Sequence, residues 1–160
     1  MVDDAAVAQS RTGSGKRAPF PHVYDVTVSG AGEAATLGGA PRPDIEGGAP
    51  DTFGGRADWW SPEHLLLASL GLCLKTTFDS FAAREGLTVR GYSSRAQAVL
   101  DKGPAGLTFT SFTVDVELHV DAAQVEAARA AMESAKRWCL VSNALKTPVE
   151  VQVEVRTTSP

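Results

Sequence analysis

The chain has 160 residues, of which 43% are hydrophobic and 21% are charged, and its formal net charge is −4. This length and composition are typical of one globular domain that needs no metal or disulfide to hold its core together. The acidic balance, with no cluster of Lys and Arg, argues against a nucleic-acid partner.

The start of the chain, residues 1–20, is small, polar and interrupted by Gly and Pro, which is typical of a mobile arm. It lacks the apolar core of a secretory signal. The apolar stretch 65–74 is half of the ~20 residues that a membrane span needs. We therefore expect a soluble, cytoplasmic protein with a single domain at 21–160 and no membrane partner. In that compartment, two cysteines are more often free thiols or a redox pair than a structural bridge.

The first predicted strand is HVYDVTVSG at 22–30, in which valines alternate with polar residues. We expect EAATL to pair with it across the GAG turn. Residues 38–58 are rich in Gly and Pro and predict a long irregular loop, a kind of segment that is often functional.

A long helix is predicted to begin at Ser61, an N-cap residue that Pro62 follows at the first helical position. Glu63 suits the positive end of the helix dipole. The stretch LLLASLGLCL at 65–74 is apolar around the whole helix circumference and indicates a helix buried on all sides. Gly86 is the expected C-terminal cap.

Two strands follow, at 87–101 and 107–121, joined by KGPAG. In the second strand, apolar and polar residues alternate strictly. This pattern predicts that one face of the strand is buried and the other is exposed to solvent. Its buried face is predicted to hold Val114, Val116, Leu118 and Val120.

A second helix is predicted at about 122–137, opened by a capping box of Asp121 and Gln124. CLVSNALK favours a short further helix, and PVEVQVEV at 148–155 closes the fold as a strand. The order β-β-α-β-β-α-β predicts an α+β fold with helices packed on an antiparallel sheet.

The two cysteines have different surroundings in the sequence. Cys73 lies in the apolar stretch 65–74, where a free cysteine is most simply interpreted as a small hydrophobic core residue. Cys139 follows Lys136 and Arg137 at a predicted helix N-terminus, where backbone N–H groups and cations lower a thiol pKa. From the residues alone, inert core cysteines and a redox pair remain as alternatives.

Other chemistries find little support. The three histidines, His22, His64 and His119, are scattered and no CxxC pair is present, which argues against a zinc site. No G-x-S-x-G elbow supports a serine hydrolase. Three aromatic residues before the long helix are expected either to pack around its start or to line an apolar pocket: Phe53, Trp59 and Trp60.

The stretch WWSPEHLLLASLGLCLKTTF resembles the OsmC/Ohr family of thiol-dependent hydroperoxide reductases. That family has an Asn/Ser-Pro-Glu helix start and a cysteine ten positions after the glutamate, as Glu63 and Cys73 are here. AKRWCLVSNAL resembles its second motif, Cys-Pro-x-Ser: Cys139 and Ser142 match, and Leu140 replaces the proline. The resemblance covers about residues 22–158. It implies an OsmC-like fold, with antiparallel sheets packed on two central helices in an intertwined homodimer.

The same resemblance implies a peroxiredoxin-like enzyme of the stress response that reduces organic hydroperoxides to alcohols. Cys73 would become a sulfenic acid, and Cys139 would condense with it to form a disulfide. An external dithiol, lipoyl-linked in Ohr-type members, would reopen that bond. No metal, haem, flavin or other cofactor is implied.

The family's reaction also needs a positively charged group near the Cys73 thiol. Burial on an apolar helix raises a thiol pKa, and a nearby cation offsets that effect. The arginine that the family places after its first strand is absent here. We expect Arg42 to replace it, with Arg56 next, and Glu63 to hold the cation in place. Ten helical residues span about 15 Å, so Glu63 is expected to serve Cys73 of a second subunit, which predicts an obligate homodimer.

Two other functions stay open at this stage. One is a non-catalytic protein of the same fold that binds an apolar small molecule, which the missing arginine favours. The other is a thiol redox sensor that transmits disulfide formation to a partner.

Overall fold

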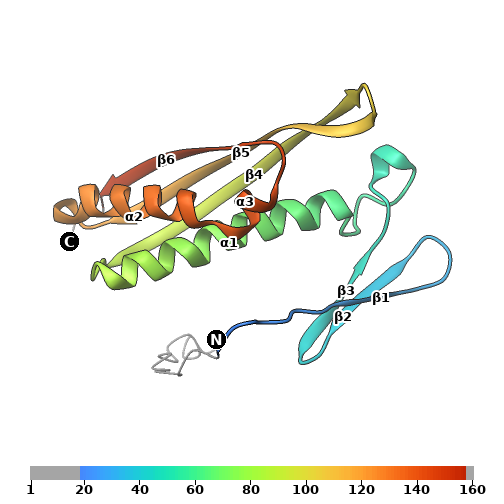
Figure 1. Ribbon diagram of the computed structural model, residues 1–160, viewed down its shortest axis with the longest axis horizontal. Coiled ribbons are helices and arrows are strands. Elements are labelled where there is room, and N and C mark those ends of the chain that lie inside the picture. The colour runs from blue at the N-terminus through green and yellow to red at the C-terminus, as the bar shows by residue number, and fades with distance from the viewer. Residues whose placement is uncertain (1–18, 158–160) are drawn as a thin grey trace, which may run out of the picture.

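The structure is a computed structural model that describes residues 19–157, so all but the last two residues of the predicted N-terminal arm lie outside it. It contains two three-stranded sheets, two long helices and a short third helix (Figure 1). This is the predicted α+β class. The elements are β1 (Thr27–Ser29), β2 (Ala35–Gly39), β3 (Arg42–Gly47), α1 (Pro62–Arg84), β4 (Val89–Gly103), β5 (Gly106–Val120), α2 (Val125–Trp138), α3 (Leu140–Ala144) and β6 (Val149–Thr157).

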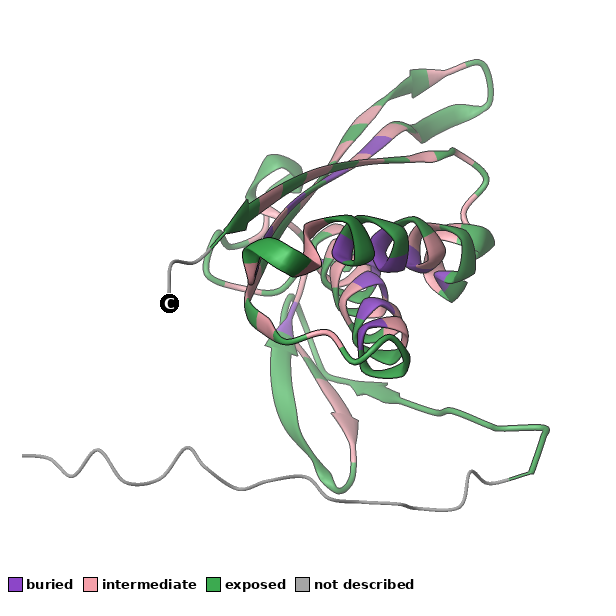
Figure 2. Ribbon diagram, turned by 90° about the vertical axis from the view of Figure 1, so that its left-hand side faces the viewer, coloured by how far each residue is buried: buried purple, intermediate pink, exposed green. Residues whose placement is uncertain are grey.

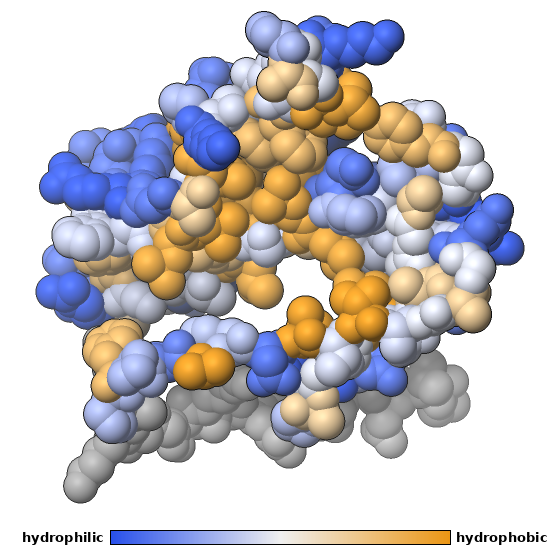
Figure 3. Space-filling model, turned by 45° about the vertical axis from the view of Figure 1, so that its right-hand side comes forward, coloured by the Kyte–Doolittle hydropathy of each residue, from blue (hydrophilic) through white to orange (hydrophobic). Residues whose placement is uncertain are grey.

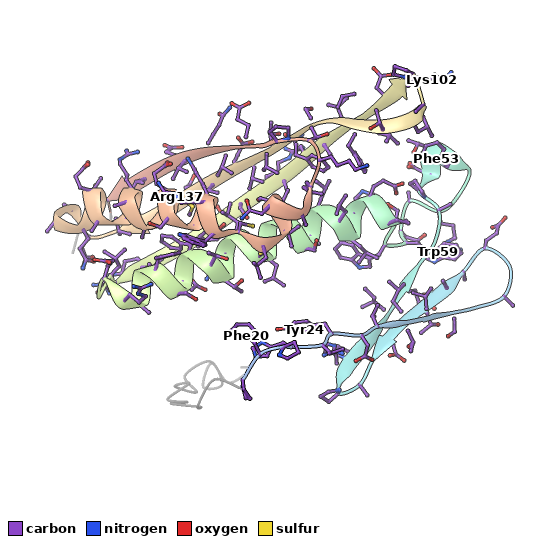
Figure 4. All side chains as sticks on the ribbon, in the orientation of Figure 1. Phe20, Tyr24, Phe53, Trp59, Lys102 and Arg137 are labelled. Carbon is purple, nitrogen blue, oxygen red and sulfur yellow. The ribbon has the colours of Figure 1, made fainter. Side chains whose placement is uncertain are left out.

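The small sheet has the antiparallel order β1-β2-β3 and extends away from the helices (Figure 1). The predicted pairing of EAATL with the first strand is confirmed, with Val28 opposite Leu37. The first strand itself is shorter than the predicted 22–30. Residues 22–26 have no partner strand in the described chain, and Tyr24 lies exposed on the segment before β1 (Figure 4).

The prediction of an irregular loop over 38–58 is wrong in its first half. β3 lies there and pairs with β2, with Leu37 opposite Ile45. Its Pro43 is tolerated because β3 is an edge strand of the small sheet, where a missing N–H need not break a ladder. The rest of the segment is irregular apart from a single 3-10 turn at Asp51–Phe53.

The long helix α1 begins and ends as predicted. The Ser61 hydroxyl accepts the backbone N–H of His64 at 3.3 Å and caps the helix. After Arg84, Gly86 adopts a φ of 65°, the left-handed conformation that glycine favours. The N–H of Leu87 then donates to the carbonyl of Ala82 at 2.9 Å and closes the last turn.

Only one face of α1 is buried in the single chain (Figure 2). The expected burial on all sides is therefore not met by the chain itself, and Leu72 is 66% exposed. By length and composition α1 is also capable of crossing a membrane, a test that core helices of globular domains pass as well, and 22% of its apolar window is buried. Its buried residues are Leu70, Leu74, Phe78 and Ala82.

The large sheet has the order β4-β5-β6 and covers α1 and α2 on one side (Figures 1 and 2). β4 and β5 form the predicted antiparallel hairpin, but β6 pairs parallel with β5, so the expectation of an antiparallel sheet is wrong at this strand. The cause is α2, which carries the chain back to the starting end of β5, as a β-α-β crossover requires. The predicted buried face of β5 is confirmed at Val114, Val116, Leu118 and Val120.

The predicted capping box before α2 is wrong. The Asp121 carboxylate makes no capping hydrogen bond and instead pairs with Arg90, Arg90 Nε to Asp121 Oδ1 at 3.1 Å. The Gln124 side chain accepts the N–H of Thr88 at 3.0 Å, so both residues tie the helix start to the start of β4. A 3-10 turn occupies 122–124, and α2 then buries an alanine-rich stripe that lets it pack on α1: Ala128, Ala131, Met132 and Ala135.

Candidate active site around two cysteines

Cys73 lies near the middle of α1, one residue before the buried Leu74. Its side chain is half-buried and packs against the hydrophobic core between the helices and the large sheet. A helix that is capped at both ends holds this sulfur in a defined place.

Cys139 lies at the junction of α2 and α3 and is 0% exposed. Asn143 fixes this junction from both sides. Its backbone N–H donates to the Cys139 carbonyl at 3.1 Å, and its side-chain amide donates to the Arg137 carbonyl at 3.1 Å. The predicted short helix is thus confirmed, and the Cys139 backbone is braced between the ends of two helices.

The fold brings the two thiols together. Cys139 and Cys73 belong to the same hydrophobic core, where α3 packs on α1, and the two side chains are close enough to influence each other. Burial raises the pKa of the Cys139 thiol above its ordinary value, and Cys73 raises it further. The hydroxyl and the backbone N–H of Ser142 act in the opposite sense and lower that pKa.

The predicted lowering of the Cys139 pKa by Lys136 and Arg137 is wrong. Burial is the largest influence on this thiol, and neither cation is among the groups that act on it. The Lys136 ammonium is held by Glu133 at 2.7 Å, and Arg137, near the end of α2, is exposed (Figure 4). Cys139 is therefore a protonated thiol near neutral pH.

Tyr92 is a site residue that the sequence analysis missed. It lies on β4 opposite Leu118, its ring is 6.0 Å from that of Phe78, and Lys75 lies 5.3 Å from its centre. Burial raises the pKa of the Tyr92 phenol, Ser94 lowers it, and negative charge on Asp79 and then on Cys139 raises it further. The alternation of β4 was the available signal, since Tyr92 precedes inward-facing alanines.

Glu63 does not lie beside the cysteines of its own chain. It lies in the first turn of α1, about 15 Å along the helix from Cys73. Its Oε2 atom is buried and has no hydrogen-bond partner within residues 19–157. It lines a cavity of about 240 Å³, the Glu63 cavity, whose apolar lining includes Phe53, Leu67, Ala98, Leu100 and Phe109.

The two candidate arginines lie outside the cysteine pair. Arg42 is exposed on β3, where its side chain lies across Gly39 and its Nη2 is 3.5 Å from the Asp25 carbonyl. Arg56 is paired with Asp58 at 2.6 Å and stacks over the Trp59 ring at 5.1 Å. Arg56 is thus engaged locally, whereas Arg42 makes one long hydrogen bond on a projecting sheet.

The aromatic residues before α1 divide between the two expected roles. Phe53 lines the Glu63 cavity, and Trp59 packs under Arg56 (Figure 4). Trp60 and His64 line a groove of about 510 Å³ between α1 and β4, the α1 groove, which also contains Leu72 and Tyr92. Figure 3 shows hydrophobic residues gathered around a hollow between the two layers of the molecule.

Among the described residues, no group of His, Cys, Asp and Glu is arranged to hold a metal ion.

Comparison with known proteins agrees with this geometry. A family profile described as OsmC-like protein matches residues 55–154, which include both cysteines and Glu63. A search of curated proteins finds no significant match.

Solved structures share the fold at low sequence identity. An OsmC-like protein of unknown function from Vibrio cholerae is 17% identical with a TM-score of 0.77, and the match covers 84% of this chain and 100% of that one. An organic hydroperoxide resistance protein from Elizabethkingia anophelis, with thiocyanate bound, is 19% identical with a TM-score of 0.68 over 87% and 100%. The organic hydroperoxide resistance protein OhrB of Bacillus subtilis is 21% identical with a TM-score of 0.61 over 84% and 98%.

Proposed function

The chain belongs to the OsmC-like protein family, and on that premise we propose that it is a cysteine-based peroxidase that reduces organic hydroperoxides to alcohols. The observation that carries the proposal is the contact between Cys73 and Cys139 in a reduced, folded chain. Two of the similar structures are organic hydroperoxide resistance proteins, which supports the choice of substrate class.

In the proposed reaction, the Cys73 thiolate attacks the distal oxygen of R–O–O–H. The S–O bond forms as the O–O bond breaks, and the alkoxide takes up a proton to leave as the alcohol. Cys139 then attacks the sulfur of the resulting sulfenic acid, so that an S–S bond forms and the hydroxyl leaves as water. The raised pKa of Cys139 suits this second role, because it keeps a proton available for the leaving hydroxyl.

A second subunit is proposed to complete the site. The buried, unpartnered oxygen of Glu63 would cost free energy unless a donor reaches it, and a cation from another subunit would be such a donor. The exposed side of α1 carries Leu72 and the small residue Ala68, and the half-buried Gly71 lies next to them. A Cβ at Gly71 would meet only Ser94 Oγ at 3.8 Å, so no contact within the described chain requires a glycine there.

A second copy of α1 explains that glycine, because small residues let helices approach closely and a helical glycine otherwise costs about 0.5–1 kcal/mol. If two α1 helices cross antiparallel near Ala68, then Glu63 of one subunit lies opposite Cys73 of its partner. We propose this homodimer as the active unit, with each site shared between two subunits.

Arg42 is the cation that we propose for Cys73. It lies on a sheet that projects from its own helical layer, a position suited to reaching a partner, and it is less engaged than Arg56 (Figure 1). Arg42→Ala is expected to slow the oxidation of Cys73, whereas Arg56→Ala is the matched control. Equal effects of the two changes would remove Arg42 from the site.

The alternative function is a non-catalytic protein that binds an apolar small molecule, and the Glu63 cavity with its apolar lining favours it. Thiol loss and alcohol release after addition of cumene hydroperoxide separate the candidates. The peroxidase predicts rapid loss of both thiols, release of cumyl alcohol and sustained turnover with a dithiol such as dihydrolipoamide. Unchanged thiols would favour the binding protein, and loss of thiols without turnover would favour a redox sensor.

A further inference from the structure

The two cysteines differ in how an external molecule can reach them. Cys139 is 0% exposed already in the single chain, and a partner subunit can only bury it further. Cys73 is half-buried. The residues on either side of Cys139 are exposed, Trp138 by 62% and Leu140 by 78%, so a molecule that approaches this junction meets their side chains instead of the sulfur.

Reopening a disulfide depends on which sulfur is attacked. A thiolate forms a bond to one sulfur of the disulfide while the other sulfur departs with the electron pair, and a leaving thiol of lower pKa departs faster. Of the two sulfurs in one disulfide, the attacking thiol reacts with the one that it can reach. In this chain, access favours attack at Cys73 and departure of Cys139.

The departing sulfur of Cys139 has a polar residue, Ser142, near it in the chain. Ser142 lies in the first turn of α3, three residues after Cys139 at the N-cap of that helix, and its hydroxyl and N–H lower the pKa of the Cys139 thiol. Two further residues interact electrostatically with Cys139, Cys73 on α1 and Tyr92 on β4, and neither carries a positive charge. Ser142 is thus the group that is placed to receive negative charge on the leaving sulfur.

We propose that the reducing thiol attacks Cys73 of the Cys73–Cys139 disulfide, and that Ser142 acts as a positioning residue for Cys139 as the leaving group. The inference rests on the proposed function for the existence of that disulfide. One thiolate of an external dithiol bonds to the Cys73 sulfur, and Cys139 leaves as a thiolate and is then protonated. The second thiol of the reductant attacks the mixed disulfide, which releases Cys73 and oxidises the dithiol to its own disulfide.

The first test identifies the attacked sulfur. The full chain is oxidised with diamide, treated briefly with the monothiol 2-mercaptoethanesulfonate, quenched with N-ethylmaleimide and digested with trypsin. Cleavage after Arg56, Lys75, Arg137 and Lys146 places the two cysteines in separate peptides, 57–75 and 138–146. The mercaptoethanesulfonate adduct is expected on 57–75 and the maleimide on 138–146. An adduct on 138–146, or equal adducts on both peptides, would overturn the inference.

The second test concerns Ser142. Ser142→Ala is expected to slow reopening of the diamide-formed disulfide by dihydrolipoamide about fivefold, the change that a net hydrogen bond of about 1 kcal/mol gives. Ser142→Thr keeps a hydroxyl and is expected to restore the rate, which a loss of packing at α3 would not explain. A wild-type rate for the alanine variant, with the disulfide formed to the same extent, would remove Ser142 from this step.

Failure of the inference is distinguishable from failure of the proposed function. Diamide makes the disulfide without any peroxide chemistry, so both tests run whether or not the chain reduces hydroperoxides. A chain that reacts with diamide but not with cumene hydroperoxide contradicts the peroxidase and leaves the order of reductive attack to be decided by the peptide map.

Discussion

The thiol of Cys139, at the junction of α2 and α3, lies beside Cys73 in the middle of α1, in one hydrophobic core. Both sulfurs are held by capped or braced backbone, α1 through Ser61 and the junction through Asn143. The pair is therefore assembled by the fold before any oxidation takes place, which is the arrangement that a two-cysteine peroxidase needs for rapid condensation of its sulfenic acid.

The raised pKa of Cys139 predicts a pH dependence of stability. The folded, reduced chain keeps the Cys139 proton at pH values at which the unfolded chain has lost it. The associated stability is fully present below the ordinary cysteine pKa of 9.0 and is lost as the pH rises through the higher folded value. Urea denaturation between about pH 8 and pH 10 is expected to show a steeper fall in the free energy of unfolding for the reduced wild type than for Cys139→Ser. Parallel curves would contradict the burial of this thiol.

Subunit sharing predicts complementation between two defective variants. Glu63→Gln and Cys73→Ser are each expected to be inactive as homodimers. Mixed after unfolding and refolding, they are expected to recover about one quarter of wild-type peroxidase activity, because half of the dimers are mixed and each contains one intact site. Each variant unfolded and refolded alone, and the wild type taken through the same cycle, control for refolding. No recovery in the mixture would place Glu63 and Cys73 outside a shared site.

The exposed side of α1 predicts a charge-sensitive dimer. Leu72→Glu would bury a carboxylate between two helices and is expected to shift the protein from dimer to monomer in sedimentation equilibrium. Leu107→Glu, at a residue of the β4–β5 hairpin that is 59% exposed, is the matched control and is expected to leave the mass unchanged. Identical masses for both variants would argue that α1 does not form the subunit contact.

A cavity made in the hydrophobic core next to the cysteines is expected to destabilise the fold strongly. Phe78 is a large residue that is completely buried between α1 and the large sheet, next to Tyr92. Phe78→Ala is expected to lower the free energy of unfolding by about 3–5 kcal/mol. Leu107→Ala is expected to change it by about 0.5 kcal/mol or less. A loss below about 1 kcal/mol for Phe78→Ala would contradict the packing described for this core.

Much of the fold was predictable because local signals and tertiary packing agree. Ser61 and Pro62 mark the start of α1, Gly86 marks its end, and the alternation in β5 identifies the buried face correctly. The parallel pairing of β6 was not predictable from its own alternation, since register and direction follow from the path of α2. β3 was hidden by Pro43, which an edge strand tolerates, and by the glycines and prolines on either side of it.

The candidate site was predicted in part for similar reasons. The resemblance of the segments around Glu63, Cys73 and Cys139 to two motifs of the OsmC/Ohr family suggested the pair of sulfurs that the fold brings together. The electrostatic argument for Cys139 failed, because sequence proximity to Lys136 and Arg137 says nothing of burial, which is the larger influence on the thiol. Tyr92 and the unpartnered carboxylate oxygen of Glu63 became visible only once the elements were placed in space.

The most direct test of the peroxidase is the fate of the two sulfurs after one equivalent of cumene hydroperoxide. Tryptic mapping of the fully reduced full chain is expected to show peptides 57–75 and 138–146 joined by a disulfide, with one equivalent of cumyl alcohol released. In Cys73→Ser, neither the alcohol nor an oxidised Cys139 is expected. Free thiols at both positions in the wild type after this treatment, in a chain that diamide does cross-link, would contradict the peroxidase.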